Sequence, residues 1–547
     1  MPLEDKDLVS IQQARQLAAQ ARLAQKELAR FDQAQVDTVV EAMAKAAAAA
    51  AEELARLAYE ETGFGNVADK TLKNRFAALD VAAYIRPMRT VGILREDPAR
   101  RIVEIAEPMG VVAAIIPSTN PTSTTINKVL ISIKSRNACV LSPHPSAERC
   151  ILETFRVLSS AGRAVGLPEG ALACMSGVTL EGTQELMRCR DTGVILATGG
   201  IGLVRAAYSS GKPAYGVGPG NVPAYVEKTA DVPRAVRDII AGKTFDYGTL
   251  CSSEQALICD RAIREAVVAE VERNGGRFLS PEEVAAVSRV VVTPRRLANP
   301  EIVGKPAPYI AEKAGVAVPA ETRALVAPLE GVGRAFPLSI EKLSPVLAFY
   351  VVEDWHQGCE RCLELLRYGG AGHTLGIHSR DDAVIREFAL QKPVYRIVAN
   401  TQTAMGATGY TTGLAPSLSL GCGAHAGNIT SDNITPLHLI NVKRLAYALP
   451  RETGAPSDGR GAPPLEQRIE AFLDERLPRA AEAAPAASPR PSPGPEPAPE
   501  LLEFVCEDDV RRAIQDGRRL HLAPRAIVTP AARDAAASSP VLVVHEE

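Results

Sequence analysis

The feature that most constrains this chain is a set of short apolar runs separated by amphipathic, helix-like segments. One run lies within Gly110-Val-Val-Ala-Ala-Ile-Ile-Pro117, and two more lie at residues 138–141 and 194–197. Runs without polar alternation are typical of strands that are covered on both faces, as in a parallel sheet. Strands that alternate with helices predict a doubly wound α/β domain. The same alternation resumes between about residues 230 and 450.

Two of these runs end in residues that suit ligand binding. The first ends in Ser118-Thr119-Asn120-Pro121, and the third ends in Ala197-Thr-Gly-Gly-Ile-Gly202. Ligands bind at the carboxyl ends of strands in α/β sheets. The Asn120 amide could donate to a developing oxyanion there, although a turn-forming Asn before Pro fits the local pattern equally well. The glycines let a phosphate approach a helix N-terminus, although a plain tight turn has the same pattern.

Cys251 is the candidate nucleophile among ten cysteines, too few in 547 residues for a disulfide framework. It lies in Phe245-Asp-Tyr-Gly-Thr-Leu-Cys-Ser-Ser-Glu254, where small and hydroxylated neighbours favour an exposed turn. A thiolate is a strong nucleophile once its pKa is lowered, but the local pattern is also that of a small core residue. The pair Cys359 and Cys362 fits a helix better than a zinc site, so no metal site is predicted.

Composition excludes several classes of partner. The chain has 61 Lys and Arg against 64 Asp and Glu, and its formal net charge of −3 attracts neither nucleic acid nor an anionic membrane. No apolar run reaches the ~20 residues that cross a bilayer. The N-terminal residues 1–11 lack the apolar region of a signal peptide. We therefore expect a cytoplasmic protein.

Composition changes abruptly after Arg451. Residues 454–464 are rich in Gly, Pro and Ser and predict a flexible linker, and residues 478–499 are too poor in large apolar side chains to pack. Between them, Leu465 to Leu477 places its apolar residues on one helical face. Residues 501–547 regain apolar residues and end in a strand-like segment at 540–544.

Taken together and in this order, the segments resemble the aldehyde dehydrogenase superfamily over about residues 8–450. They resemble most closely the CoA-acylating branch, which includes the N-terminal half of bifunctional aldehyde–alcohol dehydrogenases. The segments that carry the resemblance are residues 115–121, 141–145, 197–202, 216–221, 245–255, 341–347, 369–374 and 414–423.

This resemblance implies a reaction and the residues that perform it. Cys251 attacks the aldehyde carbon to give a thiohemiacetal, and Asn120 with the backbone N–H of Cys251 forms the oxyanion hole. Hydride passes to NAD, and the thioester left on Cys251 is transferred to coenzyme A. His373 lies where the acylating branch has a histidine, and it either helps to deprotonate CoA or orients the thioester. The residues implied in cofactor binding are Pro117, Ser142, His144, Thr198, Gly199, Gly200, Gly202, Gly218 and Glu341.

Two departures from the wider superfamily are informative. Hydrolytic members carry a water-activating Glu before a glycine pair, whereas here Gly216-Val-Gly-Pro-Gly220 has no acid. Without that base, deacylation by water should be slow, which favours CoA as the acceptor. Ser142 stands where many relatives have a Lys on the adenosine side. The choice of NAD over NADP therefore follows the branch resemblance and not a single residue.

The resemblance also implies an aldehyde dehydrogenase fold, with a Rossmann-like cofactor domain, an α/β catalytic domain, an oligomerisation hairpin and a largely disordered C-terminal extension. We expect the NAD-binding domain at residues 1–230, with the hairpin at about 90–107 because Asp97-Pro98 predicts a turn. The catalytic domain should span residues 231–425, and residues 426–452 should return to the cofactor domain. A linker and helix at 453–500 precede a tail module at 501–547. A homo-dimer or homo-tetramer is implied.

The C-terminal helix at residues 465–477 resembles the encapsulation helices of bacterial microcompartment enzymes, which bind a shell or core protein. Confinement in such a compartment implies a small volatile aldehyde, acetaldehyde or propionaldehyde. An acylating sulfoacetaldehyde dehydrogenase remains an alternative within the branch. Two further alternatives are a hydrolytic aldehyde dehydrogenase that gives free acid, and a shell-associated scaffold without activity. A helix that packs back on the enzyme is the structural alternative for 465–477.

Overall fold

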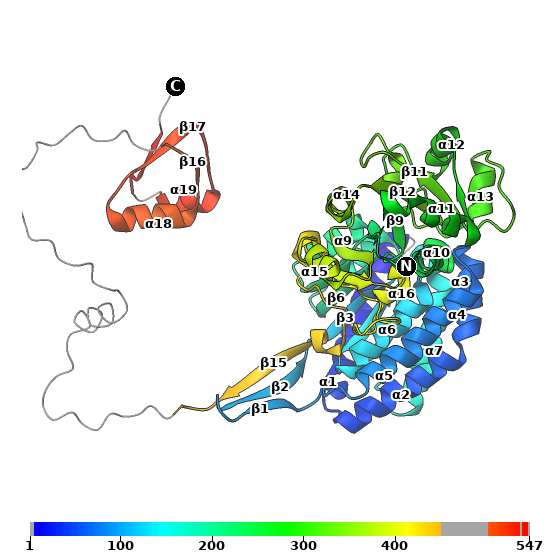
Figure 1. The fold of residues 1–547 in the computed structure, drawn as a ribbon. Helices are drawn as coiled ribbons and strands as arrows, with labels where there is room; N and C mark the ends of the chain where they lie inside the picture. Colours follow the sequence, from blue (N-terminus) through cyan, green and yellow to red (C-terminus); the bar gives the residue numbers. More distant parts are fainter. Residues whose placement is uncertain (1–4, 450–500, 537–538, 545–547) are drawn as a thin grey trace, which may run out of the picture. The chain divides into compact units, whose positions relative to one another are not determined.

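The computed structural model describes residues 5–449, 501–536 and 539–544. The chain divides into two compact units, Met1–Pro450 and Arg451–Glu547, and each is described by itself (Figure 1). Across the described segments, no helix combines the length and the apolar character needed to span a membrane.

A five-stranded parallel sheet lies at the centre of the first half of the larger unit. Its strand order is β5-β4-β3-β6-β7. The strands are β3 (Val111–Ile115), β4 (Ala138–Ser142), β5 (Leu172–Cys174), β6 (Thr192–Thr198) and β7 (Ala214–Val217). The three apolar runs identified in the sequence therefore form β3, β4 and β6, as predicted. From β3 the chain builds the sheet outward through β4 and β5, then returns to β6 on the other side. This reversal places the switch point of the sheet between β3 and β6.

Helices cover both faces of this sheet, as the side-chain alternation along β3 requires. Val112 and Ala114 pack against α2 (Gln33–Ala49), α6 (Pro121–Lys134) and α7 (Glu148–Ala164). Val111, Ala113 and Ile115 pack against α1 (Lys6–Leu28), α8 (Leu180–Arg188) and α9 (Ile201–Tyr208). Alanines on the buried side of α1 let that helix approach the sheet closely. The burial of both faces explains why these strands are apolar throughout.

A long helical segment lies in the same half of the molecule and supplies residues that pack behind the site. It begins after α3 (Ala51–Thr62) and comprises α4 (Val67–Arg75), a π-helical turn η1 (Phe76–Asp80) and α5 (Val81–Ile85). The Asn66 side chain caps α4 by accepting from the N–H of Asp69 at 2.9 Å.

A seven-stranded parallel sheet forms the second half, in the order β10-β11-β12-β9-β8-β13-β14. The strands are β8 (Val222–Val226), β9 (Glu254–Asp260), β10 (Gly276–Phe278), β11 (Ala324–Pro328), β12 (Val346–Val352), β13 (Gly372–His378) and β14 (Val394–Ala399). The helices of this half are α10 (Val232–Thr244), α11 (Arg264–Arg273), α12 (Pro281–Val291), α13 (Ala307–Lys313), α14 (Trp355–Tyr368), α15 (Asp382–Leu390) and α16 (Thr403–Gly406).

A three-stranded antiparallel sheet projects from the larger unit (Figure 1). The predicted hairpin forms from β1 (Ile93–Asp97) and β2 (Ile102–Pro108). Strand β15 (Ile440–Ala446) pairs with the other edge of β2, with Lys443 opposite Ile105. Beyond Ile440 the side chains of β15 are exposed, and they include Val442 and Leu445.

The smaller unit contains a parallel sheet with its own core. It comprises β16 (Leu502–Val505), α18 (Glu507–Asp516), β17 (Leu520–Val528), α19 (Pro530–Ala536) and β18 (Leu542–Val544), with strand order β16-β17-β18. Its core includes Val505, Val510 and Leu520. The strand-like end of the sequence thus forms β18. The predicted linkers and the helix at 465–477 lie outside the described residues.

Because the smaller unit has a separate core, removing residues 451–547 should leave the larger unit folded. We expect the main thermal transition to shift by less than about 2 °C, which corresponds to under ~1 kcal/mol. Scanning calorimetry of the full and truncated chains measures this shift. As a control, Val510→Asp in the full chain buries a charge only in the smaller core and should leave the main transition in place. Loss of the main transition on truncation would contradict the division.

Candidate functional site

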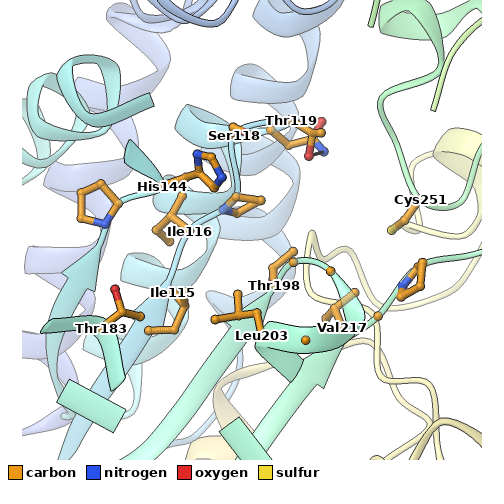
Figure 2. A pocket seen from close by; sticks show the side chains of 18 of the residues that line it. Ile115, Ile116, Ser118, Thr119, His144, Thr183, Thr198, Leu203, Val217 and Cys251 are labelled. Carbon is orange, nitrogen blue, oxygen red and sulfur yellow. Dashed lines mark hydrogen bonds between the residues drawn. The ribbon is translucent and has the colours of Figure 1, made fainter. Parts of the chain in front are cut away.

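A cavity of about 490 Å³ lies at the switch point of the five-stranded sheet (Figure 2). The segments after β3, β4, β6 and β7 form one wall. Cys251, just before β9, and Glu341, before β12, belong to the opposite wall. The carboxyl ends of one sheet therefore face the amino ends of strands in the other. Figure 2 shows Cys251 on its own loop, across from the strand ends that carry Thr119 and Thr198.

The cavity brings together most of the residues singled out from the sequence. Those that line it are Cys251, Asn120, Pro117, His144, Thr198, Gly199, Gly200, Gly202, Gly218 and Glu341. Two predicted residues, Ser142 and His373, are buried and do not line it. Within the described part of the chain, Glu341 is the only acid in the cavity wall, and the wall contains no Lys or Arg.

The turn after β6 has the geometry of a phosphate cradle. Gly200 is the N-cap of α9, and no side chain caps that helix, so its first N–H groups face the cavity without an acceptor. A Cβ added at Gly200 or Gly202 would meet open space. The Oγ1 atom of Thr198 is buried and has no hydrogen-bond partner. These free donors on a neutral wall fit the pyrophosphate of a dinucleotide.

Ser142, which the resemblance implies on the adenosine side, does not line the cavity itself. Its hydroxyl is buried and lies 2.9 Å from the Thr183 hydroxyl. Thr183 lies in the first turn of α8 and lines the cavity in place of Ser142. Ser142 is the last residue of a strand whose side chains are all buried, and its hydroxyl lies directly behind a residue of the cavity wall.

The Cys251 loop begins in an unusual backbone conformation. Asp246, Tyr247 and Gly248 have φ angles of 46°, 52° and 77°, all in the left-handed region. Each non-glycine residue there costs ~1–2 kcal/mol. The loop is also close to the backbone of Gly220, where an added Cβ would lie 2.2 Å from the Cys251 carbonyl oxygen. Glycine is therefore required at position 220, and the strained turn exposes the Cys251 side chain to the cavity.

The surroundings of Cys251 favour the neutral thiol in the resting protein. Burial, the Glu341 carboxylate and the Cys422 thiol raise the pKa of Cys251 to about 12, opposed by Arg396 and a backbone hydrogen bond. Arg396 is buried in β14 and donates to the Ser431 carbonyl at 3.0 Å and to Cys422 Sγ at 3.9 Å. Within the described residues, its guanidinium has no carboxylate within ion-pair distance. Its positive charge thus lowers the pKa of the Cys251 thiol and opposes the effect of burial.

His373 lies behind the cavity wall, beside Gly220. A Cβ at Gly220 would lie 3.0 Å from the His373 ring. The Nδ1 atom is 2.9 Å from the Thr374 hydroxyl, and Nε2 is buried without a partner. Burial, with a smaller contribution from Arg396, lowers the pKa of His373 to about 3. The ring is therefore neutral at physiological pH and is a weak base.

Glu341 connects the two walls. Its carboxylate accepts a hydrogen bond from the Gly220 N–H at 2.9 Å. Burial raises the pKa of Glu341 to about 7, opposed by that hydrogen bond and by Lys243 and Lys342. The carboxylate thus supports the Gly216–Gly220 segment while its other oxygen remains available to a ligand.

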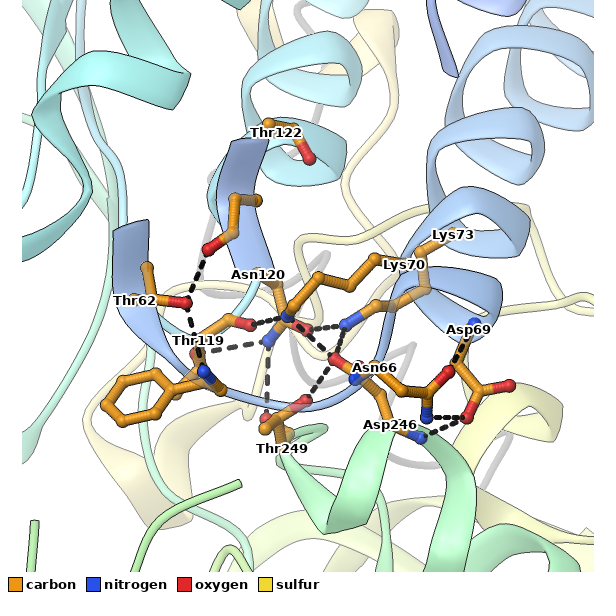
Figure 3. Close-up of polar contacts among 12 residues, drawn as sticks. Thr62, Asn66, Asp69, Lys70, Lys73, Thr119, Asn120, Thr122, Asp246 and Thr249 are labelled. Atoms are coloured by element: carbon orange, nitrogen blue, oxygen red, sulfur yellow. Dashed lines mark hydrogen bonds and ion pairs between the residues drawn. The ribbon is translucent and has the colours of Figure 1, made fainter. Parts of the chain in front are cut away.

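A buried ion cluster that was not predicted from the sequence lies behind Asn120. Lys70 and Lys73 of α4 both pair with Asp246, and Lys73 also donates to the Asn120 amide oxygen (Figure 3). The two lysines are one helical turn apart, but such spacing is also common on exposed helix faces. Only Asp246, five residues before Cys251, lay within a segment already of interest.

No group of three or more His, Cys, Asp and Glu side chains that could hold a metal occurs in the part of the chain that the structure describes. Cys359 and Cys362 lie in α14, and both are buried in the core beside the seven-stranded sheet.

Comparison with known proteins identifies the family. The pattern of the aldehyde dehydrogenase family matches residues 7–275. An acetylating aldehyde dehydrogenase from Geobacillus thermoglucosidasius is 52% identical, with a TM-score of 0.81 over 83% of this chain and 100% of that one. The chain belongs to the aldehyde dehydrogenase family. A propionaldehyde dehydrogenase from the fucose utilisation bacterial microcompartment of Clostridium phytofermentans is 27% identical, with a TM-score of 0.72 over 79% of this chain and 97% of that one.

A longer relative is similar over the same region. The bifunctional aldehyde-alcohol dehydrogenase of Escherichia coli is 41% identical over 435 residues, which is 79% of this chain and 49% of that protein. This aldehyde dehydrogenase thus spans about half the length of the bifunctional relatives that it matches.

The high pKa of Cys251 predicts a thiol of low reactivity at neutral pH. The rate of alkylation by iodoacetamide should rise about tenfold per pH unit between pH 7 and 9, because the thiolate fraction rises tenfold per unit below the pKa. Glu341→Gln removes a neighbouring negative charge and should raise the rate at each pH. Mass spectrometry of the Cys251 peptide measures it. Glu360→Gln, at an exposed position of α14, is the control. A rate that is already maximal at pH 7 would contradict this assignment.

Proposed function

We propose that this aldehyde dehydrogenase oxidises a short-chain aldehyde with NAD and coenzyme A, giving an acyl-CoA and NADH. The observation that carries the proposal is the composition of one cavity. It holds a thiol, a side-chain amide and an open phosphate cradle, and it lacks an acid in the Gly216–Gly220 segment beside Cys251. The acetylating relative supports the same chemistry.

In the first step, the Cys251 thiol gives up its proton to water, and the resulting thiolate attacks the aldehyde carbon and forms a carbon–sulfur bond. The carbonyl oxygen becomes an oxyanion, which the Asn120 amide and the Cys251 N–H stabilise. In the resting protein the Asn120 Nδ2 atom donates to the Thr249 carbonyl at 3.3 Å and to the Thr119 hydroxyl at 3.1 Å. A charged oxyanion is a stronger acceptor than either neutral group and can replace one of them.

A nicotinamide dinucleotide, when bound, accepts the hydride that leaves the thiohemiacetal carbon as the thioester forms. Thr198 and the N-terminus of α9 would hold its pyrophosphate, and Glu341 would accept from the nicotinamide ribose. His144 would lie near the adenosine. NADP needs a cation for its 2′-phosphate, whereas the described wall has no Lys or Arg. This neutral wall supports NAD.

The thioester on Cys251 is then transferred to coenzyme A. The CoA thiolate attacks the acyl carbon, and the Cys251 thiolate leaves. Activation of water instead would need a base near Cys251, and the one carboxylate of the described wall already accepts from Gly220. His373 is a weak base, so in this proposal it orients the thioester or CoA through its free Nε2 atom.

The aldehyde is small and uncharged in this proposal, with acetaldehyde and propionaldehyde as the candidates. A sulfonate or carboxylate on the substrate would be stabilised by a cation, and the described cavity wall has none. The sulfoacetaldehyde alternative therefore lacks a binding group in this wall.

An aldehyde panel assayed with and without CoA tests the reaction and the substrate together. With acetaldehyde or propionaldehyde and CoA, NADH formation should be continuous. Without CoA it should stop after about one equivalent per Cys251, because the thioester accumulates when deacylation is slow. Cys251→Ala should abolish both phases, whereas Cys506→Ser, in the smaller unit, should retain them. Equal steady rates with and without CoA would indicate a hydrolytic enzyme. No NADH from any aldehyde would indicate a scaffold, and a preference for sulfoacetaldehyde would contradict the uncharged substrate.

We further propose a cofactor domain, a catalytic domain up to residue 425 and a return segment at residues 426–452. The first boundary lies between β7 and β8 and not at residue 230, because β8 belongs to the seven-stranded sheet. The return of the last segment to the cofactor domain is supported by its contacts. Asn137 donates to the Leu439 carbonyl at 2.8 Å, and Leu439 is buried among α2, α6 and α7. The exposed apolar side chains of β15 support a role of the projecting sheet in a dimer or tetramer.

We also propose that the enzyme is housed in a bacterial microcompartment. The amphipathic segment 465–477 and the microcompartment relative support this location. A fluorescent protein fused to residues 453–500 should co-purify with shells when it is expressed together with the shell proteins of the host. Replacing Leu465 and Phe472 by Glu should release it, because charge disrupts the apolar face. Equal recovery of both fusions would contradict a targeting role for the helix.

A further inference from the structure

The buried cluster behind Asn120 has a defined arrangement of donors and acceptors (Figure 3). Lys70, Lys73 and Asp246 are all at most 2% exposed. Lys70 donates to Asp246 at 3.0 Å and to the Thr119 carbonyl at 3.3 Å. Lys73 donates to Asp246 and to the Asn120 amide oxygen. Two ammonium groups thus share one carboxylate, and the second of them directly contacts the oxyanion-hole side chain.

Lys73 decides which end of the Asn120 amide faces the nucleophile. An ammonium group has only donors, so the amide must present its oxygen to Lys73. The Nδ2 group then points to the other side, toward the Thr249 carbonyl, two residues before Cys251. Without Lys73, the amide could rotate and present its oxygen to the oxyanion, which would repel it.

Asp246 joins this arrangement to the Cys251 loop. It accepts from the Thr249 hydroxyl at 2.7 Å and from the Asn66 N–H at 2.8 Å. One carboxylate therefore contacts α4, the loop before α4 and the nucleophile loop. The Lys73–Asp246 ion pair therefore links Asn120 to the Cys251 loop, in addition to the hydrogen bond from Asn120 to the Thr249 carbonyl.

We propose that Lys73, held by Asp246, is a positioning residue that orients and polarises the Asn120 amide for oxyanion stabilisation. The inference rests on the proposed function, in which Asn120 binds the oxyanion. The charge on Lys73 withdraws electron density from the amide and makes its N–H a stronger donor. Loss of one oxyanion-hole donor lowers the rate ~10²–10³-fold. Loss of its positioning group should lower kcat about 10–100-fold, within that limit.

A double-mutant cycle distinguishes positioning from general structural damage. Lys73→Met should lower kcat for NADH formation about 10–100-fold and change KM for the aldehyde by less than about threefold. In an Asn120→Ala background, the same substitution should change kcat by less than about twofold, because the group through which it acts is gone. Equal losses of kcat in both backgrounds would overturn the proposal.

Two further variants keep the test decisive. Lys134→Met is the control for the loss of a buried ion pair. Lys134 is a buried lysine at the far end of α6, and it pairs with Asp37. This variant should cost thermal stability without showing coupling to Asn120. Lys73→Gln keeps an N–H donor but lacks the charge, so its kcat should lie between those of the native enzyme and Lys73→Met. It should also fold if Lys73→Met fails to fold. A Lys134→Met variant that shows the same coupling, or a Lys73→Gln variant with unchanged kcat, would contradict the role.

The pH profile gives a second readout. Burial lowers the pKa of Lys73 to about 8, opposed by Asp246 and Asp69 and reinforced by Lys70. Asn120, the N-cap residue of α6, does not titrate. Lys73 is therefore charged below about pH 8 and neutral above it. The thiolate fraction of Cys251 rises with pH in the native enzyme and in Lys73→Met alike, so the ratio of native kcat to Lys73→Met kcat isolates Lys73. This ratio should fall as pH rises through about 8, and a ratio that does not change with pH would overturn the assignment.

These outcomes can be told apart from failure of the proposed function. The cycle is read in NADH formation, which both CoA-dependent and hydrolytic enzymes perform through the same oxyanion. If NADH forms equally without CoA, the proposed acceptor is wrong while the coupling between Lys73 and Asn120 is still measured. If CoA is required but the coupling is absent, only the positioning role fails.

Discussion

The site depends on one buried carboxylate, Asp246, and its two lysines. A buried carboxylate without partners is strongly disfavoured, and removing one partner of a buried pair typically costs ~3–5 kcal/mol. Lys70 and Lys73 offset this cost while they tie α4 to the turn that precedes Cys251. The left-handed residues of that turn are held in place by the same contacts. Backbone strain in the turn before Cys251 is thus stabilised by ion pairs that lie outside the cavity.

The described cavity wall has one acid, Glu341, and no Lys or Arg, and this distribution of charge sets its chemistry. Cys251 and His373 are uncharged in the resting protein because burial disfavours their ionised forms. Charged groups stand behind the wall: Arg396 near the thiol and Lys73 behind the amide. Such an arrangement provides no cation in the described cavity wall that could bind an anionic aldehyde. It strengthens interactions with charge that develops during the reaction, because preorganised donors in surroundings of low dielectric act more strongly than they do in water.

Much of the site could be predicted because it lies at strand ends with a clear pattern. The apolar runs specify β3 and β6, and the residues after them, Asn120 and Thr198, meet at the switch point of the sheet. Ser142 lies one layer behind the cavity wall, in contact with Thr183, and the pattern of a buried strand does not specify whether its last side chain reaches the cavity. Lys73 was missed because a lysine in a helix is usually exposed, and its burial depends on a partner 173 residues away.

The sequence by itself determined the parallel α/β architecture and the order of its strands along the chain, because both follow from local apolar periodicity. It also predicted roles for Cys251, Asn120 and the glycine-rich turn, through the resemblance of several short segments taken together. Only the tertiary structure decided that Lys73 orients Asn120, that Arg396 lies near Cys251 and that His373 stands behind the wall. These relations join segments far apart in the chain through burial and ion pairing, and such interactions exist only when the two sheets are packed together.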